Sequence, residues 1–133
     1  MKELKITAED KNMDRVNDFI HSCLPSECPP IIMNKIDLAV EEIFVNISHY
    51  AYNPDVGEAW ISVDFVDNVL TVIFKDGGKE FNPIAKKDPD ITLGAEERSI
   101  GGLGIFLTKK FMDSVDYEYK NGQNILTITK NIA

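Results

Sequence analysis

Two short polar turns, each set between apolar segments, constrain the fold of this 133-residue chain more than any other feature. The turns are Asp67-Asn68 and Asn121-Gly122. Asn-Gly favours positive φ at both central positions of a tight turn, which makes it the strongest short-range signal for a hairpin. We therefore predict two antiparallel strand pairs. Their four strands are Trp60–Phe65, Leu70–Phe74, Val115–Tyr119 and Ile125–Thr129.

Helical periodicity precedes and separates these hairpins. Apolar residues recur at spacings of three and four from Lys11 to Leu24 and from about Ile31 to Tyr52, which predicts two amphipathic helices. A first strand is expected at Leu4–Thr7 and a third helix from about Leu103 to Met112. This order predicts an α+β fold, a two-layer α/β sandwich in which helices cover one face of a mixed, mainly antiparallel sheet.

Composition and charge argue against several classes of function. Apolar residues make up 44% of the chain and charged residues 27%, as in an ordinary globular domain. The net charge of −8 argues against nonspecific binding to nucleic acid or to an anionic membrane. Cys23 and Cys28 have no second pair that would suggest a zinc site. We expect a single domain over residues 1–133, cytoplasmic, with no direct contact with nucleic acid or membrane.

Glu42 and Asn46 form the first candidate site. They lie four residues apart in the second predicted helix, so they share one side of it, next to the apolar stripe. Glu41 falls on the solvated side of the same helix. A carboxylate and an amide in this position can contact a ligand in a cleft, but they also suit an ordinary helix flank with a structural hydrogen bond. The spacing alone leaves both interpretations open.

Glycines mark two further candidate segments. In Asp76-Gly77-Gly78-Lys79-Glu80-Phe81, an acid at a strand end could accept a hydrogen bond from a ligand amine, and the glycines permit close approach of the main chain. An ordinary turn is the alternative. Gly101-Gly102-Leu103-Gly104 opens the last predicted helix, where free amides can bind an anion. It is neither a dinucleotide-binding fingerprint nor a Walker loop. The long loop from Asp76 to Gly104 is typical of a functional segment.

In order and separation, these segments resemble the three sequence boxes of the Bergerat-fold (GHKL) ATPases, the superfamily of gyrase, histidine kinases and mismatch-repair ATPases. Glu42-x-x-x-Asn46 matches the N-box, Asp76-x-Gly78-x-x-Phe81 the first glycine box, and Gly102-x-Gly104 the second. The resemblance runs from about Ile36 to the end of the chain. It implies that the predicted sandwich is a Bergerat fold.

Within the superfamily, the stretches Glu97-Arg98-Ser99 and Phe111-Met112-Asp113 are similar to the anti-sigma-factor serine/threonine kinases. The resemblance implies an ATP-dependent serine/threonine protein kinase that binds a sigma factor and phosphorylates a STAS-domain anti-anti-sigma partner. It also allows a homodimer. A nucleotide-dependent regulator that binds a partner without phosphorylating it is the alternative, and a detached histidine-kinase catalytic domain is a third hypothesis.

The resemblance further implies roles for individual residues. Asp76 would accept a hydrogen bond from the adenine amino group, and Gly78 would let the base lie against the main chain. Asn46 would ligate the Mg²⁺ that holds the phosphates of ATP, and Glu42 would be the general base that takes a proton from the partner's serine. The remaining expected ATP-binding residues are Phe81, Arg98, Gly102 and Gly104, with Lys86 and Lys87 as weaker candidates for a phosphate contact.

Two departures from the family pattern concern the glycines. Gly101 adds a glycine ahead of the second box, and the Gly-Thr pair expected in the last hairpin is absent. Asn124 lies near that position and is a candidate substitute for the water-mediated adenine contact of the Gly-Thr pair.

Overall fold

The structure is a computed structural model that describes residues 1–85 and 102–133. The helices are α1 (Met13–Ser22), α2 (Pro30–Asn46) and α3 (Gly102–Phe111), with shorter turns of helix η1 (Asp10–Asn12), η2 (Ile47–Ala51) and η3 (Pro83–Ala85). The strands are β1 (Lys2–Thr7), β2 (Glu58–Val66), β3 (Val69–Asp76), β4 (Ser114–Lys120) and β5 (Gln123–Asn131). Each predicted strand and helix is therefore present, with shifted ends.

The five strands form one sheet in the order β1-β2-β3-β5-β4. Both predicted hairpins are confirmed, β2 with β3 and β4 with β5, and Asp67, Asn68, Asn121 and Gly122 adopt positive φ at their turns. The expectation of a mixed sheet needs one correction. Strand β4 runs parallel to β3, but β5 lies between them, so each pairing between described strands is antiparallel.

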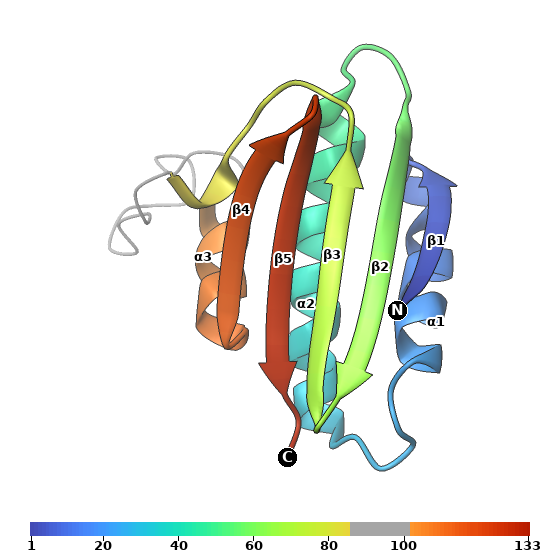
Figure 1. The fold of residues 1–133 in the computed structure, drawn as a ribbon, viewed down its shortest axis with the longest axis vertical. Coiled ribbons are helices and arrows are strands. Elements are labelled where there is room, and N and C mark those ends of the chain that lie inside the picture. Colours follow the sequence, from blue (N-terminus) through green and yellow to red (C-terminus); the bar gives the residue numbers. More distant parts are fainter. Residues whose placement is uncertain (86–101) are drawn as a thin grey trace.

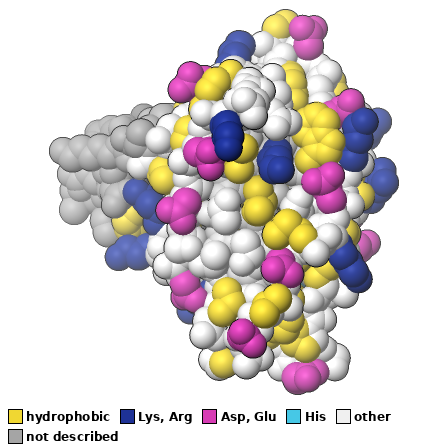
Figure 2. Space-filling view, in the orientation of Figure 1, with side chains coloured by type: hydrophobic (Ala, Val, Ile, Leu, Met, Phe, Trp, Pro, Cys, Tyr) yellow, Lys and Arg dark blue, Asp and Glu magenta, His cyan; other side chains and the backbone are white. Residues whose placement is uncertain are grey.

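The two-layer arrangement is confirmed. Figure 1 shows α1, α2 and α3 packed on one face of the sheet, while the opposite face carries no described helix. On that opposite face, side chains of both charges are scattered among hydrophobic ones (Figure 2). No helix in the described ranges is long and apolar enough to cross a bilayer.

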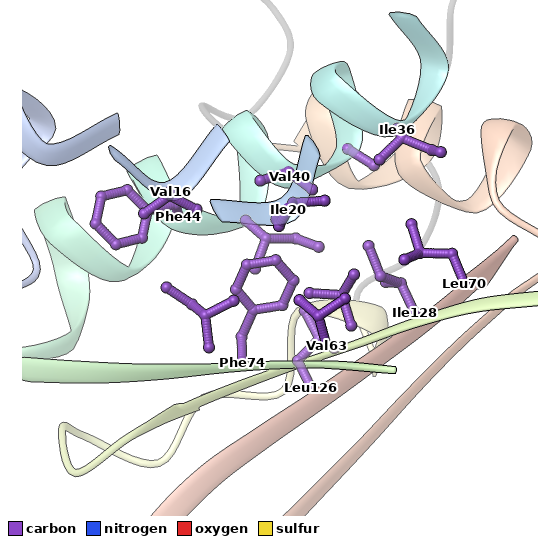
Figure 3. Close-up of a cluster of buried hydrophobic side chains, with 14 of the residues drawn as sticks. Val16, Ile20, Ile36, Val40, Phe44, Val63, Leu70, Phe74, Leu126 and Ile128 are labelled. Carbon is purple, nitrogen blue, oxygen red and sulfur yellow. The ribbon is translucent and has the colours of Figure 1, made fainter. Parts of the chain in front are cut away.

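The core lies between the helices and the sheet. Phe44 on α2 and Phe74 on β3 are among its largest fully buried side chains, and Figure 3 shows them with neighbours from the strands and from α1. The strands contribute alternate residues, as the period-two pattern predicts. The labelled members of this cluster are Val16, Ile20, Ile36, Val40, Phe44, Val63, Leu70, Phe74, Leu126 and Ile128.

The second predicted helix differs from its expectation at its C-terminal end. The α-helix ends at Asn46, and Ile47–Ala51 continue as a π-helical turn, η2. Contacts outside the helix hold η2 in place: Asp10 accepts hydrogen bonds from Ser48 and pairs with His49 Nε2 at 2.6 Å. Because π-helical turns occur often at functional sites, η2 indicates that the residues around Asn46 are candidates for such a site.

Candidate nucleotide-binding site

A cavity of about 530 Å³ lies between the C-terminal part of α2 with η2 and the adjacent ends of β3, β4 and β5. This volume is within the range of small-molecule sites. Its lining is mostly apolar, with a few polar groups. The lining residues are Ile43, Asn46, Ile47, Tyr50, Ala51, Phe74, Asp76, Lys79, Glu80, Phe81, Pro83, Ile105, Tyr117, Asn124 and Leu126.

Three of the site residues predicted from the sequence meet at this cavity. Asn46 comes from the end of α2, Asp76 from the end of β3, and Phe81 from the segment that follows β3. Figure 1 shows that segment crossing the end of β5 on its way to η3, beside β4. The fold thus brings the N-box amide and the acid of the first glycine box to one apolar chamber.

Asp76 is the most deeply buried acid of the cavity. It is 4% exposed, and its Oδ1 accepts hydrogen bonds from the Gly78 amide at 2.9 Å and from Asn124 Nδ2 at 3.0 Å. Burial raises the pKa of Asp76, and these two hydrogen bonds oppose the rise. Among the described residues, no hydrogen bond reaches Asp76 Oδ2. One carboxylate oxygen is therefore anchored by the protein while the other is available to a ligand.

The turn after Asp76 is fastened to η2. The Lys79 amide donates to the Ala51 carbonyl at 2.9 Å, and a Cβ added at Gly78 would overlap that same carbonyl group. Only glycine fits at position 78 without moving one of the two segments. Gly78 does not itself line the cavity, so it supports the wall beside Asp76.

Tyr52 is a supporting residue that the sequence analysis missed. Its hydroxyl accepts a hydrogen bond from the Gly77 amide at 2.7 Å and donates one to the Glu58 carbonyl at 2.6 Å. It therefore connects the turn after β3 to the first residue of β2. No sequence signal distinguishes Tyr52 from an ordinary residue at a helix end, since its partners are main-chain groups of distant segments.

Glu42 lies beside the main cavity rather than in its wall. It lines a smaller cavity of about 70 Å³ between α2 and α3, and a Cβ added at Gly104 would overlap its carboxylate. Asn46, one helical turn further along α2, does line the main cavity. Burial raises the pKa of Glu42, and the neighbouring side-chain amide of Asn46 opposes the rise. Glu42 and Asn46 thus lie on neighbouring turns of α2, one at each of the two cavities.

The remaining predicted residues are placed only in part. Gly102 is the first residue of α3, so the second glycine box does open a helix. Arg98, Lys86, Lys87 and Gly101 lie outside the described residues. Among the residues that are described, no group of three or more His, Cys, Asp or Glu side chains could hold a metal ion.

Residues 6–130 match the histidine kinase-like ATPase domain, which decides the family. The chain belongs to the histidine kinase-like ATPase domain family. Membership of an ATPase domain family implies a nucleotide-binding site, and the cavity lined by Asn46 and Asp76 is the candidate for it.

Relatives of this ATPase domain include proteins named serine-protein kinase RsbW. That of Bacillus mycoides (strain KBAB4) is 31% identical over an alignment covering 75% of this chain and 64% of the relative. The RsbW of Bacillus cereus (strain AH820) is 33% identical over an alignment covering 71% of this chain and 61% of the relative. The chain thus spans less than two thirds of the length of these relatives.

Solved structures confirm the fold of this ATPase domain. The structure of the RsbU and RsbW domains of Rv1364c from Mycobacterium tuberculosis matches with a TM-score of 0.67 at 14% identity, over 99% of this chain and 33% of that one. The blue-light activated histidine kinase of Erythrobacter litoralis EL346 matches with a TM-score of 0.61 at 14% identity, over 92% of this chain and 41% of that one. The α+β sandwich is therefore a fold that this chain shares with both solved structures.

Proposed function

We propose that this domain binds ATP with Mg²⁺ and transfers the γ-phosphate to a serine or threonine of a partner protein. One observation carries the proposal: Asp76 and Asn46 line the same cavity, and Glu42 lies beside it on α2, one helical turn before Asn46. The residues proposed to bind the base, bind the metal and act as general base therefore lie in or next to one cavity. The relatives named serine-protein kinase RsbW support the same activity.

The adenine end of the site is assigned to Asp76. Its Oδ2 would accept a hydrogen bond from the amino group of adenine, while the apolar walls would contact the faces of the ring. Phe81 and Tyr50 line the cavity and are 45% and 48% exposed, so their rings are accessible to a ligand. This arrangement would favour adenine over guanine. The buried acid can accept a hydrogen bond from the amino group of adenine, whereas guanine has an oxygen acceptor at the corresponding position. The apolar walls accept no hydrogen bonds.

The phosphate end is assigned to Asn46 and the start of α3. Asn46 lines the cavity, and its side-chain oxygen would ligate Mg²⁺, which prefers oxygen ligands and takes few from the protein when phosphates supply the rest. Bound there, the ion would neutralise phosphate charge in a domain of net charge −8. Ile105, in the first turn of α3, lines the cavity, so a phosphate bound at that side would be close to the amides of the turn.

Glu42 is proposed as the general base. It would take the proton from the partner's serine hydroxyl while that oxygen forms its bond to the γ-phosphorus and the bond from the γ-phosphorus to the β,γ-bridging oxygen breaks, leaving ADP. Burial raises the pKa of Glu42, which makes it a stronger base than a solvated glutamate. Glu42 lies one helical turn before Asn46 on α2, so the proposed base and the proposed metal ligand are carried by the same helix.

Phosphotransfer is tested with the purified domain, Mg-ATP and a candidate STAS-domain anti-anti-sigma protein. Glu42→Gln should lower the rate by about 10²–10⁴-fold with little change in ATP affinity, because a positioned base acts only on the chemical step. Glu41→Gln is the matched control, since Glu41 precedes it on α2 and is exposed. Equal rates in the wild type and in Glu42→Gln would refute the assigned base.

The partners follow from the same proposal. We place a sigma factor and a STAS-domain protein among them, with no direct contact with nucleic acid or membrane, and we expect a cytoplasmic protein able to form a homodimer. Co-purification in ATP and in ADP tests the partners, because a switch of this kind should hold different proteins in the two nucleotide states.

A regulator that binds nucleotide without transferring phosphate is the second candidate. The observation that favours it is the position of Glu42, whose carboxylate packs against Gly104 outside the main cavity. It predicts nucleotide-dependent partner binding and no phosphorylated product. Acid-stable phosphoserine on the partner would exclude it, and would also exclude a histidine-kinase domain, whose phosphohistidine product is acid-labile.

A further inference from the structure

Asn124 uses its whole hydrogen-bonding capacity inside the protein. Its Nδ2 donates to Asp76 Oδ1 at 3.0 Å and to the Lys79 carbonyl at 2.8 Å, and its Oδ1 accepts from the Phe81 amide at 3.0 Å and the Tyr117 hydroxyl at 2.5 Å. A side-chain amide has two donor hydrogens and two acceptor lone pairs, so these four bonds exhaust it. Asn124 therefore has no group left for a water-mediated contact with adenine, which corrects the expectation from the sequence.

The location of Asn124 explains this set of partners. It lies near the start of β5, directly opposite Asp76 in the register of β3 and β5, and it is 7% exposed. The turn that follows Asp76 passes over this end of β5 (Figure 1), so its main chain comes within reach of the same amide. One side chain thus connects β3, the turn and β4.

The consequence for Asp76 is a fixed orientation. Two donors, Asn124 Nδ2 and the Gly78 amide, converge on Oδ1, which prevents the carboxylate from rotating about its last bond. Without the bond from Asn124, one donor would remain and either oxygen could take it. The same bond favours the ionised form of Asp76 against the effect of burial, which raises its pKa.

We propose that Asn124 is a positioning residue for base recognition: it anchors Asp76 Oδ1 and the turn to Phe81, so that Asp76 Oδ2 is presented to the amino group of adenine. The inference rests on the proposed binding of ATP and deepens it. It assigns the selectivity for a 6-aminopurine to a three-part arrangement of Asn124, Asp76 and the Gly78 amide, in which Asn124 makes no hydrogen bond to the nucleotide.

The test compares ATP with the triphosphate of purine riboside, which has a hydrogen in place of the 6-amino group. Wild-type protein should prefer ATP by about 10- to 150-fold in Kd, the range expected for a hydrogen bond to a charged acceptor. Asn124→Asp keeps the shape and both acceptor sites but removes the donors and sets a carboxylate against Asp76. This variant should bind ATP more weakly and prefer it by less than about threefold, because the two acids would share a proton.

Two further variants control the comparison. Asn131→Asp makes the same chemical change at an exposed position near the other end of β5 and should retain the wild-type preference. Asn124→Ala removes the donors without adding a charge and should also lose the preference, so it replaces Asn124→Asp if that variant does not fold. A general loss of pocket structure would weaken both nucleotides equally and leave their ratio unchanged.

The outcomes separate this inference from the proposed function. If wild-type protein binds both nucleotides equally, the adenine contact of Asp76 is absent, and the proposed recognition and the role of Asn124 fail together. If the wild type prefers ATP and a folded Asn124 variant keeps that preference in full, Asp76 recognises adenine without help from Asn124, and this inference alone is overturned.

Discussion

The substitution Asp76→Asn separates the proposed role of this carboxylate in binding adenine from its structural role. Asparagine has the same shape, and its oxygen can still accept the hydrogen bonds from the Gly78 amide and Asn124 that now reach Oδ1. It places an NH₂ group where Oδ2 stood, so a donor would face the amino group of adenine. The structure therefore predicts a specific loss of adenine recognition with the turn after β3 intact.

The expected loss can be estimated from the geometry. One hydrogen bond to a charged acceptor contributes about 1.5–3 kcal/mol, and 1.4 kcal/mol is a factor of ten in affinity, so ATP should bind about 10- to 150-fold more weakly. Isothermal titration calorimetry with a non-hydrolysable ATP analogue measures this directly. Unchanged affinity in the variant would refute the assignment of Asp76 to the base.

The pH dependence of stability gives an independent check without nucleotide. Burial raises the pKa of Asp76, so the folded protein binds a proton at this residue more readily than the unfolded chain does. The ionised residue therefore costs stability, and that cost appears as the pH rises through its pKa. As the pH rises through this pKa, the unfolding free energy of the Asp76→Asn variant should therefore increase relative to that of the wild type. A relative stability that is flat with pH would contradict the burial of this charge.

Three further substitutions test other parts of the site and the core. Asn46→Ala should abolish the dependence of nucleotide affinity on Mg²⁺ while circular dichroism stays unchanged, and retained Mg²⁺ dependence would place the ion elsewhere. Gly104→Ala should displace the flexible end of Glu42 and slow phosphotransfer by about 10-fold or more with little effect on stability; an unaltered rate would show that the observed position of Glu42 is not the active one. Phe44→Ala, which empties a fully buried position in the core, should lower the unfolding free energy by about 3–5 kcal/mol in chemical denaturation, and a loss below 1 kcal/mol would contradict its packing.

Local sequence patterns predicted the elements of this fold well. The two turns at Asp67-Asn68 and Asn121-Gly122 fixed the hairpins, because positive φ at adjacent positions is a property of a few residue types. The helices followed from apolar spacing. Apolar spacing did not predict where α2 ends, because the π-helical turn at Ile47–Ala51 depends on partners such as Asp10, which lies far away in the chain.

The candidate site was predictable in its residues and less so in its geometry. Spacing placed Glu42 and Asn46 on one side of α2, and in the structure they line two cavities next to that helix. It could not show that Glu42 packs against Gly104 of α3, because the contact depends on how closely the two helices approach. The sequence singled out Asn124 only because it lies near the position of the absent Gly-Thr pair. Its four hydrogen bonds could not be predicted, because their partners come from three separate segments of the chain.

The sequence by itself determined which segments form strands and helices and where the chain turns. These are local properties, set by side-chain shape and by the periods of helix and strand. Only the tertiary structure decided that β5 pairs with β3 and sets Asn124 opposite Asp76, and that Asp76 meets Asn46 across one cavity. Pairing and packing join segments distant in the chain, and their register depends on the free energy of the whole core rather than on either segment alone.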